Sequence, residues 1–419
     1  MQSLFFALIR VSIGRQERLS HTPTEMEWRE LYALAEKQAV IGICFCGVQR
    51  LQRLGYDIPM DLYMKWLGMA AKIQQRNELM NRRSVEVQRM LAKEGMRMSI
   101  LKGQGVARYY KLKDESLELR ANSLGMLRQS GDIDIYVPCG MDKALRWCRE
   151  KYGDVDFDYI NAHVPVFKDV EVELHWRAQS MANLFRNSRL QQWLVREETK
   201  EMIFGGKADL KPSESLQSSE TSITVPSLEF NAFYLMLHCY NHEFSSGLGL
   251  RQLMDYYFLL RNINVNKKDK GDNSAPFNCL FMEFGIERFV GAVMWIMQEV
   301  FGLERERLLC VPDEKEGRYI LAEVMAGGNF GHHDKRIRKV GNGKWQSVFA
   351  TLQHAMHVLK RYPSEALWMP VWMVYHFIWK RTLKTINTFS YEYFVHSSVF
   401  PDSSGARRYS LLLDFARVD

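Results

Sequence analysis

The sequence contains no CxxC pair, and its seven cysteines are scattered over 419 residues. This absence excludes a zinc ribbon and a disulfide framework, and a reducing, cytoplasmic location is expected. Long hydrophobic runs are absent too. The most apolar stretch, residues 366–379, includes Pro370 and His376 and is shorter than the ~20 residues that cross a bilayer. We expect a buried helix there and no membrane span.

Strong charge of one sign is also absent. Lysine and arginine number 56 against 49 acidic residues, a formal net charge of +7. Such a mild excess favours anionic ligands, but its scatter along the chain argues against nucleic acid as the partner. The hydrophobic content of 47% excludes a disordered chain. The length predicts two or three domains.

The spacing of apolar residues divides the chain into parts. Residues 1–94 have helical spacing, residues 95–180 mix helical and alternating patterns, and residues 181–399 return to helical spacing. Within the last part, residues 205–222 show no hydrophobic period and predict a mobile loop, and residues 400–419 predict a loosely held tail. The expected fold class is α+β: a small mixed-sheet module flanked by N-terminal helices and a larger C-terminal helical domain.

Short strands are expected in the central module, and helices follow it. The strands are predicted over residues 133–137, 155–159, 164–167 and 170–174. The main helices beyond them are predicted over residues 228–243, 248–262, 286–301, 319–326 and 366–384.

The most informative segment is the strand that carries Asp132 and Asp134. Residues two apart share one face of a strand, so both carboxylates converge while Ile133 and Ile135 enter the core. Two such charges repel unless a cation lies between them, and oxygen ligands on a rigid strand suit Mg²⁺, with Mn²⁺ as a substitute. Alternatively, the strand is half-buried and its polar face meets water; taken alone, the two interpretations are about equally good.

A second acidic strand strengthens the metal interpretation. Glu171, Glu173 and His175 alternate with Val172 and Leu174, so they share one face. If this strand lies beside the first, Glu173 completes a cluster of three carboxylates able to hold two metal ions.

A glycine turn precedes the acidic strands. Lys102-Gly103-Gln104-Gly105 follows a short apolar strand and opens a helix, and a turn of this kind presents free backbone N–H groups to a phosphate. Lys102 and Arg128 add positive charge on either side.

Two weaker groups lie further along the chain. His238 and His242 share a helical face, and Asp255 lies on the following helix. They could line an acceptor pocket together with His175 or bind a transition metal, but the preferred interpretation is one buried histidine and one surface histidine. The glycine-rich turn at residues 327–334 is interpreted as a surface turn rather than a loop beside the site.

The ordered set of motifs resembles a known family. The order Ile100-Leu101-Lys102-Gly103, then Arg128-x-x-Gly131-Asp132-Ile133-Asp134, then Glu173-Leu174-His175 resembles the nucleotidyltransferase superfamily related to DNA polymerase β. It is most similar to a bacterial branch of uncharacterised nucleotidyltransferases, over roughly residues 30–330.

The resemblance implies an enzyme that moves a nucleoside monophosphate from a nucleoside triphosphate, expected to be ATP, to a hydroxyl group of a small-molecule or protein acceptor. It implies that Asp132 and Asp134 are metal ligands and that Glu173 is the third carboxylate, which draws the proton from the attacking hydroxyl. It further implies that the triphosphate is held by the turn and its flanking cations, Lys102, Gly103, Gln104, Gly105 and Arg128.

The turn departs from the superfamily pattern. Gln104 stands where that superfamily usually has serine or glycine, so a serine-like phosphate donor is missing. This departure favours a second hypothesis, a catalytically inactive nucleotide-binding or scaffold protein that retains the fold. A nucleic-acid-binding protein with a fortuitous Asp-x-Asp strand is the third.

Overall fold

The computed structural model describes residues 1–111, 123–210, 222–263, 275–331 and 352–397. These residues form an α+β fold, as the sequence predicts. The chain divides into two compact units. The first contains residues 1–156, 162–179 and 197–336, and the second contains residues 157–161, 180–196 and 337–419.

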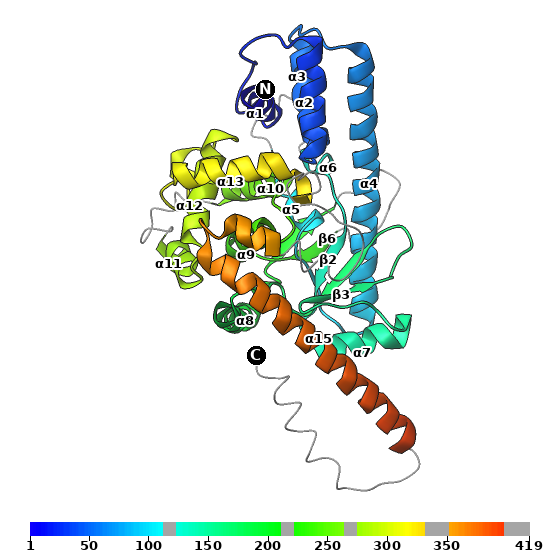
Figure 1. The fold of residues 1–419 in the computed structure, drawn as a ribbon. Helices are drawn as coiled ribbons and strands as arrows, with labels where there is room; N and C mark the ends of the chain where they lie inside the picture. The colour runs from blue at the N-terminus through cyan, green and yellow to red at the C-terminus, as the bar shows by residue number, and fades with distance from the viewer. Residues whose placement is uncertain (112–122, 211–221, 264–274, 332–351, 398–419) are drawn as a thin grey trace. The chain divides into compact units, whose positions relative to one another are not determined.

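Four helices precede the sheet and pack against one another (Figure 1). A capping box starts the second of them, because Thr24 accepts a hydrogen bond from the backbone of Glu27 and the Glu27 side chain accepts one from Thr24. The longest helix buries Leu62, Trp66 and Met80 on one face, so the predicted helical spacing is confirmed. The helices are α1 (Gln2–Ser12), α2 (Glu25–Lys37), α3 (Ile41–Arg53) and α4 (Met60–Lys93).

The central sheet is small and mixed. Its strand order is β1-β2-β4-β3, with β1 antiparallel to β2 and β2 parallel to β4. The short helices around it are α5 (Gln104–Ala107) and α6 (Ser123–Met126), and α7 (Gly140–Tyr152) follows β2. The strands are β1 (Ser99–Ile100), β2 (Ile133–Tyr136), β3 (Asn161–Val164) and β4 (Val172–His175).

One strand of the sheet, β3, differs from the predicted positions. The strands predicted over 155–159 and 164–167 are wrong, since the strand here is β3. The reason is a turn between them: the backbone N–H of Asp158 donates to the carbonyl of Asn161 at 2.7 Å, and the Asp158 carboxylate accepts from the N–H of Tyr159. An aspartate that binds the backbone locally favours a turn over a strand.

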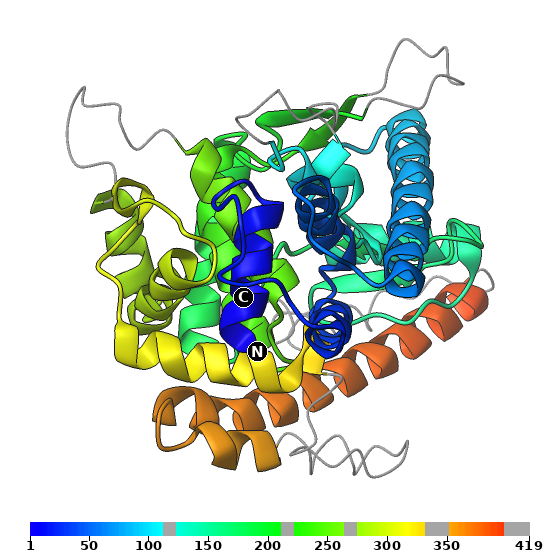
Figure 2. The ribbon, with the colours of Figure 1, turned by 90° about the horizontal axis from the view of Figure 1, so that it is seen from above.

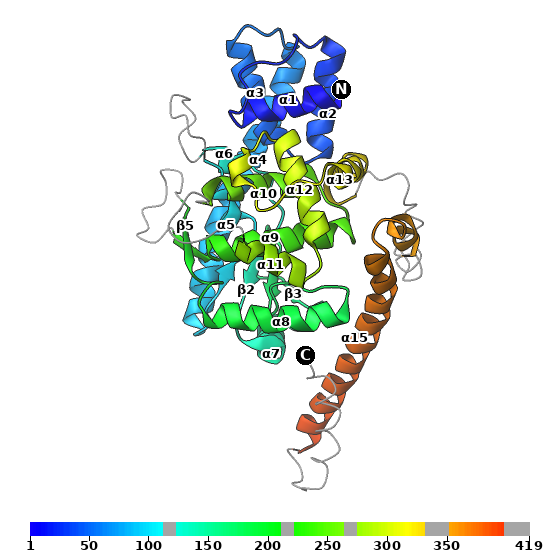
Figure 3. The same ribbon diagram turned by 90° about the vertical axis from the view of Figure 1, so that its left-hand side faces the viewer.

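Helices dominate after the sheet. The α9–α10 pair and the α12–α13 pair are each closely packed (Figures 2 and 3). Ser227 caps α9 by accepting from the N–H of Phe230 at 3.1 Å. The helices are α8 (Leu184–Thr199), α9 (Leu228–Glu243), α10 (Leu250–Asn262), α11 (Ala275–Glu283), α12 (Glu287–Glu299) and α13 (Glu314–Gly327).

The loop predicted over residues 205–222 is shorter at both ends. Residues Gly206–Asp209 form β5 and residues Ser222–Val225 form β6, and the two pair as an antiparallel ribbon. Gln88 of α4 holds this ribbon by accepting from the N–H of Thr224 at 2.7 Å. A contact with a residue so distant in the sequence produces no hydrophobic periodicity in strands this short, so the sequence pattern does not predict them. Residues 211–221 and the predicted tail 400–419 lie outside the described ranges.

The apolar stretch near the C-terminus forms part of α15 (Pro363–Ser397) in the second unit. Trp372 and Trp379 pack edge-on against Tyr159 of the same unit, with ring centroids 5.1 and 5.2 Å apart. Leu367 and Val374 are exposed, so the prediction of a buried helix is wrong for one of its faces. None of the described helices combines the length and the apolar character that crossing a membrane requires.

Candidate active site

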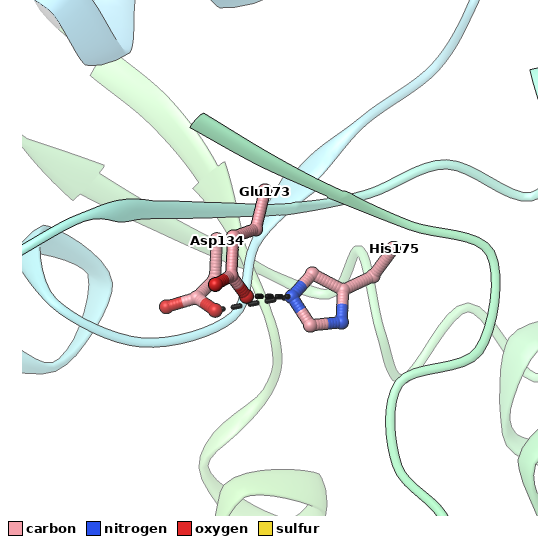
Figure 4. A group of neighbouring side chains, drawn as sticks. All are labelled: Asp134, Glu173 and His175. Carbon is pink, nitrogen blue, oxygen red and sulfur yellow. Dashed lines mark hydrogen bonds and ion pairs between the residues drawn. The ribbon is translucent and has the colours of Figure 1, made fainter. Parts of the chain in front are cut away.

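The parallel pairing of β2 and β4 brings the two acidic strands together. Asp134 and Glu173 are direct register partners, and His175 follows two residues later on the same face. The imidazole Nε2 of His175 lies 3.0 Å from Asp134 Oδ1 and 3.3 Å from Glu173 Oε2. Figure 4 shows both carboxylates directed at this nitrogen. The predicted adjacency of the two acidic strands is confirmed.

Asp134 is a buried carboxylate. Its side chain is 2% exposed, and every residue of β2 is buried, so the interpretation of a polar strand face in water is wrong. The ammonium of Lys102 lies 2.8 Å from Asp134 Oδ1. Burial alone would raise the pKa of Asp134, but Lys102 and the hydrogen bond from His175 outweigh it and hold this pKa well below its usual value. Asp134 is therefore ionised at neutral pH.

Asp132 lies just before β2 and is partly exposed. Its pKa is raised, first by the negative charge of Asp134 and then by burial. Glu173 adds to the same repulsion. Three carboxylates that disfavour each other's ionised form fit a divalent cation, because such a cation removes the repulsion.

A nitrogen ligand is also within reach of this cluster. Single ligand atoms of Asp134, Glu173 and His175 lie within 4.8 Å of one another. Burial lowers the pKa of His175, but its hydrogen bonds to Asp134 and Glu173 outweigh this and raise it. The residues that could hold a metal are therefore the three carboxylates, with His175 beside two of them.

The glycine turn has the predicted strand-turn-helix form. Gly103 has φ +57° and is the N-cap of α5, a conformation that favours glycine. A side chain at Gly105 would bring its Cβ within 2.8 Å of the Ile100 carbonyl oxygen. Both glycines are thus required by the backbone path from β1 into α5, whatever they bind.

The Gln104 side chain is buried and points into the protein interior. Its amide donates to Asn81 Oδ1 at 2.5 Å, and its carbonyl oxygen accepts from Ser130 at 3.0 Å. These two hydrogen bonds therefore connect the turn to α4 and to the loop before β2. A phosphate contact from Gln104 would have to come from its backbone N–H, and the predicted role of the turn stays a prediction.

Arg128 and Asp255, predicted in different parts of the site, form a buried ion pair with each other. Nε of Arg128 lies 2.6 Å from Asp255 Oδ1 and its NH2 nitrogen lies 2.7 Å from Oδ2. The hydroxyl of Tyr110 donates to the same carboxylate at 2.6 Å. This geometry gives both side chains a structural role, and contact of either with a substrate stays a prediction.

The two histidines of α9 form a pair. Their Nε2 atoms are 3.1 Å apart, and His242 also contacts Ser246 at 2.7 Å. Burial first, and then the charge of Lys102, lower the pKa of His238 far below its ordinary value and that of His242 to about 3. The interpretation of one buried and one surface histidine is therefore wrong: both are half-buried, and the charge of Lys102 acts on both.

Three residues near the site were not predicted. His163 of β3, whose side chain is 56% exposed, has Nδ1 3.7 Å from Glu173 Oε1. Phe330 places its ring 5.0 Å from that of His242, so the glycine-rich turn lies against the histidine pair and is not a plain surface turn. Arg251 stands in the first turn of α10 and donates to the carbonyl of Gln129 at 2.9 Å. Only Arg251 had a sequence signal, a cation at the start of a helix.

Comparison with known proteins identifies the family. A family model described as uncharacterised nucleotidyltransferase matches residues 24–302, a span that contains the acidic strands, the glycine turn, the histidine pair and Arg251. No curated protein and no solved structure matches the chain. The matched span is more than half of the 419 residues, so the chain belongs to this uncharacterised nucleotidyltransferase family and is a nucleotidyltransferase.

Proposed function

We propose that this nucleotidyltransferase uses Mg²⁺, or Mn²⁺, to transfer a nucleoside monophosphate from a nucleoside triphosphate to a hydroxyl group of a small-molecule or protein acceptor. ATP is the expected triphosphate. The observation that carries the proposal is the register of β2 and β4, which sets the carboxylates of Asp134 and Glu173 side by side. Asp132 extends this cluster, and the glycine turn begins at Lys102, which is bound to Asp134.

The carboxylates would hold the cations. Asp132 and Asp134 serve as ligands, with Glu173 as the third. When bound, divalent ions stabilise the negative charge that develops on the attacking and leaving oxygens. The depressed pKa of Asp134 keeps it ionised and ready to bind.

Glu173 is the best-placed proton acceptor. Its side chain is 19% exposed, against 2% for Asp134, so an acceptor hydroxyl can reach it more easily. Burial would raise its pKa, but the hydrogen bond from His175 outweighs this and lowers it. An ionised and reachable carboxylate can take a proton from the attacking hydroxyl. The exposed imidazole of His163 lies on its other side.

The test compares Asp134→Asn and Glu173→Gln with a matched control, Glu171→Gln. Glu171 precedes the same strand but is exposed. Pyrophosphate release is measured with each nucleoside triphosphate, Mg²⁺ and a panel of hydroxyl-bearing acceptors. We expect no detectable transfer with Asp134→Asn, and loss of about 100-fold or more with Glu173→Gln. The control keeps wild-type activity.

Folding and binding are measured on the same samples. Circular dichroism checks that each variant is folded. Stabilisation of the wild type by triphosphate with Mg²⁺ in a thermal shift assay checks binding. Transfer by folded Asp134→Asn at the wild-type rate would contradict the proposal. Binding by the wild type without release of pyrophosphate from the triphosphate, whichever acceptor is present, would favour the catalytically inactive alternative.

A further inference from the structure

Arg251 is a half-buried cation, and no carboxylate in the described part of the chain contacts it directly. Among the residues that the structure describes, no ion pair joins it to an acidic side chain. Its guanidinium donates to the carbonyl of Gln129 at 2.9 Å and lies over the Phe330 ring, 5.0 Å from the centroid. Its Nε is buried and has no hydrogen-bond partner within the described part of the chain. A buried donor without an acceptor is costly for the fold.

The position of Arg251 in its helix adds to this cost. It stands in the first turn of α10, which carries no acidic residue there. The first turn of a helix bears a partial positive charge, so it favours anions and disfavours an arginine. A local rule of helix stability is therefore broken at this position, as happens at functional sites.

The neighbours of Arg251 make the region more positive still. Arg128 is close enough to lower the pKa of Arg251, which burial and this like charge together bring to about 10. Asp255, the carboxylate whose charge most favours the protonated form of Arg251, is already bound by Nε and one terminal nitrogen of Arg128. Asp255 thus pairs with Arg128, and Arg251 is left without an ion pair among the described residues.

Arg251 also lies near the acidic cluster. The charge of Asp132 acts on it directly, and Gln129, which it contacts, is three residues before Asp132. The residue that supports it from the other side, Phe330, has φ +54°, a conformation rare for a bulky side chain. Phe330 also contacts His242, so the guanidinium is held by a residue that borders the histidine pair and by the Gln129 carbonyl.

We infer that Arg251 binds the polyphosphate of the nucleotide, the part that departs as pyrophosphate. This inference rests on the proposed function. A phosphate oxygen would supply the acceptor that the buried Nε lacks and the negative charge that the two arginines lack. Arg128 is bound by the Asp255 carboxylate, whereas the Arg251 guanidinium contacts only a backbone carbonyl and a ring among the described residues and can accept an anionic partner.

The experiment uses the full chain and two probes, inorganic tripolyphosphate with Mg²⁺ and AMP with Mg²⁺, measured by calorimetric titration. Arg251→Gln should weaken tripolyphosphate binding by about 10- to 100-fold, the loss expected for a charged hydrogen bond. AMP binding should be unchanged. Arg251→Lys, which keeps the charge, should recover part of the loss.

Arg108→Gln is the matched control. The Arg108 guanidinium also donates to a backbone carbonyl, that of Lys207 at 2.7 Å, and also lies over an aromatic ring, that of Tyr109. Arg108→Gln therefore removes the same kinds of contact as Arg251→Gln, and this control should leave tripolyphosphate binding unchanged.

Each outcome discriminates. Tripolyphosphate binding by folded Arg251→Gln as tight as by the wild type would overturn the inference and leave the proposed function standing. An equal loss for both probes would indicate a merely structural role and would also overturn it. Failure of the wild type to bind either tripolyphosphate or any nucleoside triphosphate would contradict the proposed function, and the inference with it.

Discussion

Replacing Asp255 with asparagine should destabilise the protein far more than removing a surface carboxylate. Asp255 and Arg128 have side chains only 9% and 7% exposed, and the pair is bidentate. Asparagine keeps the volume but leaves the Arg128 guanidinium buried without a counter-charge and close to Arg251. Breaking a buried pair by removing one partner costs about 3–5 kcal/mol. That is a large part of a typical stability of about 5–15 kcal/mol.

The control is Asp61→Asn. Asp61 pairs with Arg29 at 3.0 Å, but the two side chains are 66% and 48% exposed, and such a pair contributes about 0–1 kcal/mol. Urea unfolding followed by circular dichroism measures both variants. At a slope of about 1–3 kcal/mol per molar urea, Asp255→Asn should lower the midpoint by about 1–5 M. Asp61→Asn should hardly move it.

A third variant separates lost charge from lost packing. Replacing both partners, as Arg128→Met with Asp255→Leu, removes the uncompensated charge and should recover much of the stability that Asp255→Asn loses. If Asp255→Asn is as stable as Asp61→Asn, the buried pair does not stabilise this fold and the reasoning is refuted. If the double variant is less stable than Asp255→Asn, the loss came from packing.

Two further predictions concern the turn and the histidine pair. Gly105→Ala should lower the free energy of unfolding by about 1–3 kcal/mol, because the new Cβ would lie 2.8 Å from the Ile100 carbonyl oxygen. A Cβ at Gly131 meets nothing within 4 Å, so equal urea midpoints for Gly105→Ala and Gly131→Ala would contradict this steric argument. His242 has its pKa lowered from 6.5 to about 3 by burial, so below pH 6.5 the unfolded chain binds a proton that the folded chain does not, and stability falls as the pH falls from about 6.5 towards 3. At pH 5.5 the wild type has lost about 1 kcal/mol of its free energy of unfolding in this way. Between pH 7.5 and 5.5, His242→Gln should therefore lose less stability than the wild type. Identical losses would show that His242 is not buried in its neutral form.

Local patterns in the sequence predict the helices and the acidic strand well. The spacing of Leu62, Trp66 and Met80 follows from one buried face of α4, and the alternation at Asp132 to Ile135 follows from the pleat of β2. Both signals need only neighbouring residues. The strands around Asp158 were misplaced because a turn made by a single side chain interrupts the apolar pattern.

The partners of the charged residues could not be predicted in this way. Arg128 and Asp255 are far apart in the sequence, and only the packing of α10 against α5 brings Asp255 to the arginine and to Tyr110. The sequence therefore assigns each residue to a substrate, which stays a prediction, and does not reveal that the two pair with each other. Arg251 was overlooked because its signal is a departure from helix capping preferences rather than a recognised motif.

The amount of buried charge at this site is more than stability requires. Buried ion pairs are often no more stabilising than apolar residues of the same size, and the raised pKa of Asp132 shows that the carboxylates disfavour one another. Arg251 is disfavoured too, at the positive end of a helix with an unsatisfied Nε. These unfavourable features lie at one place in the fold, where carboxylates suited to cations adjoin an arginine suited to anions. A metal-bound triphosphate carries positive charge on its metal and negative charge on its phosphates. Its binding would relieve the repulsion among the carboxylates and supply an anion to Arg251. In a scaffold that binds no ligand, both unfavourable features would remain.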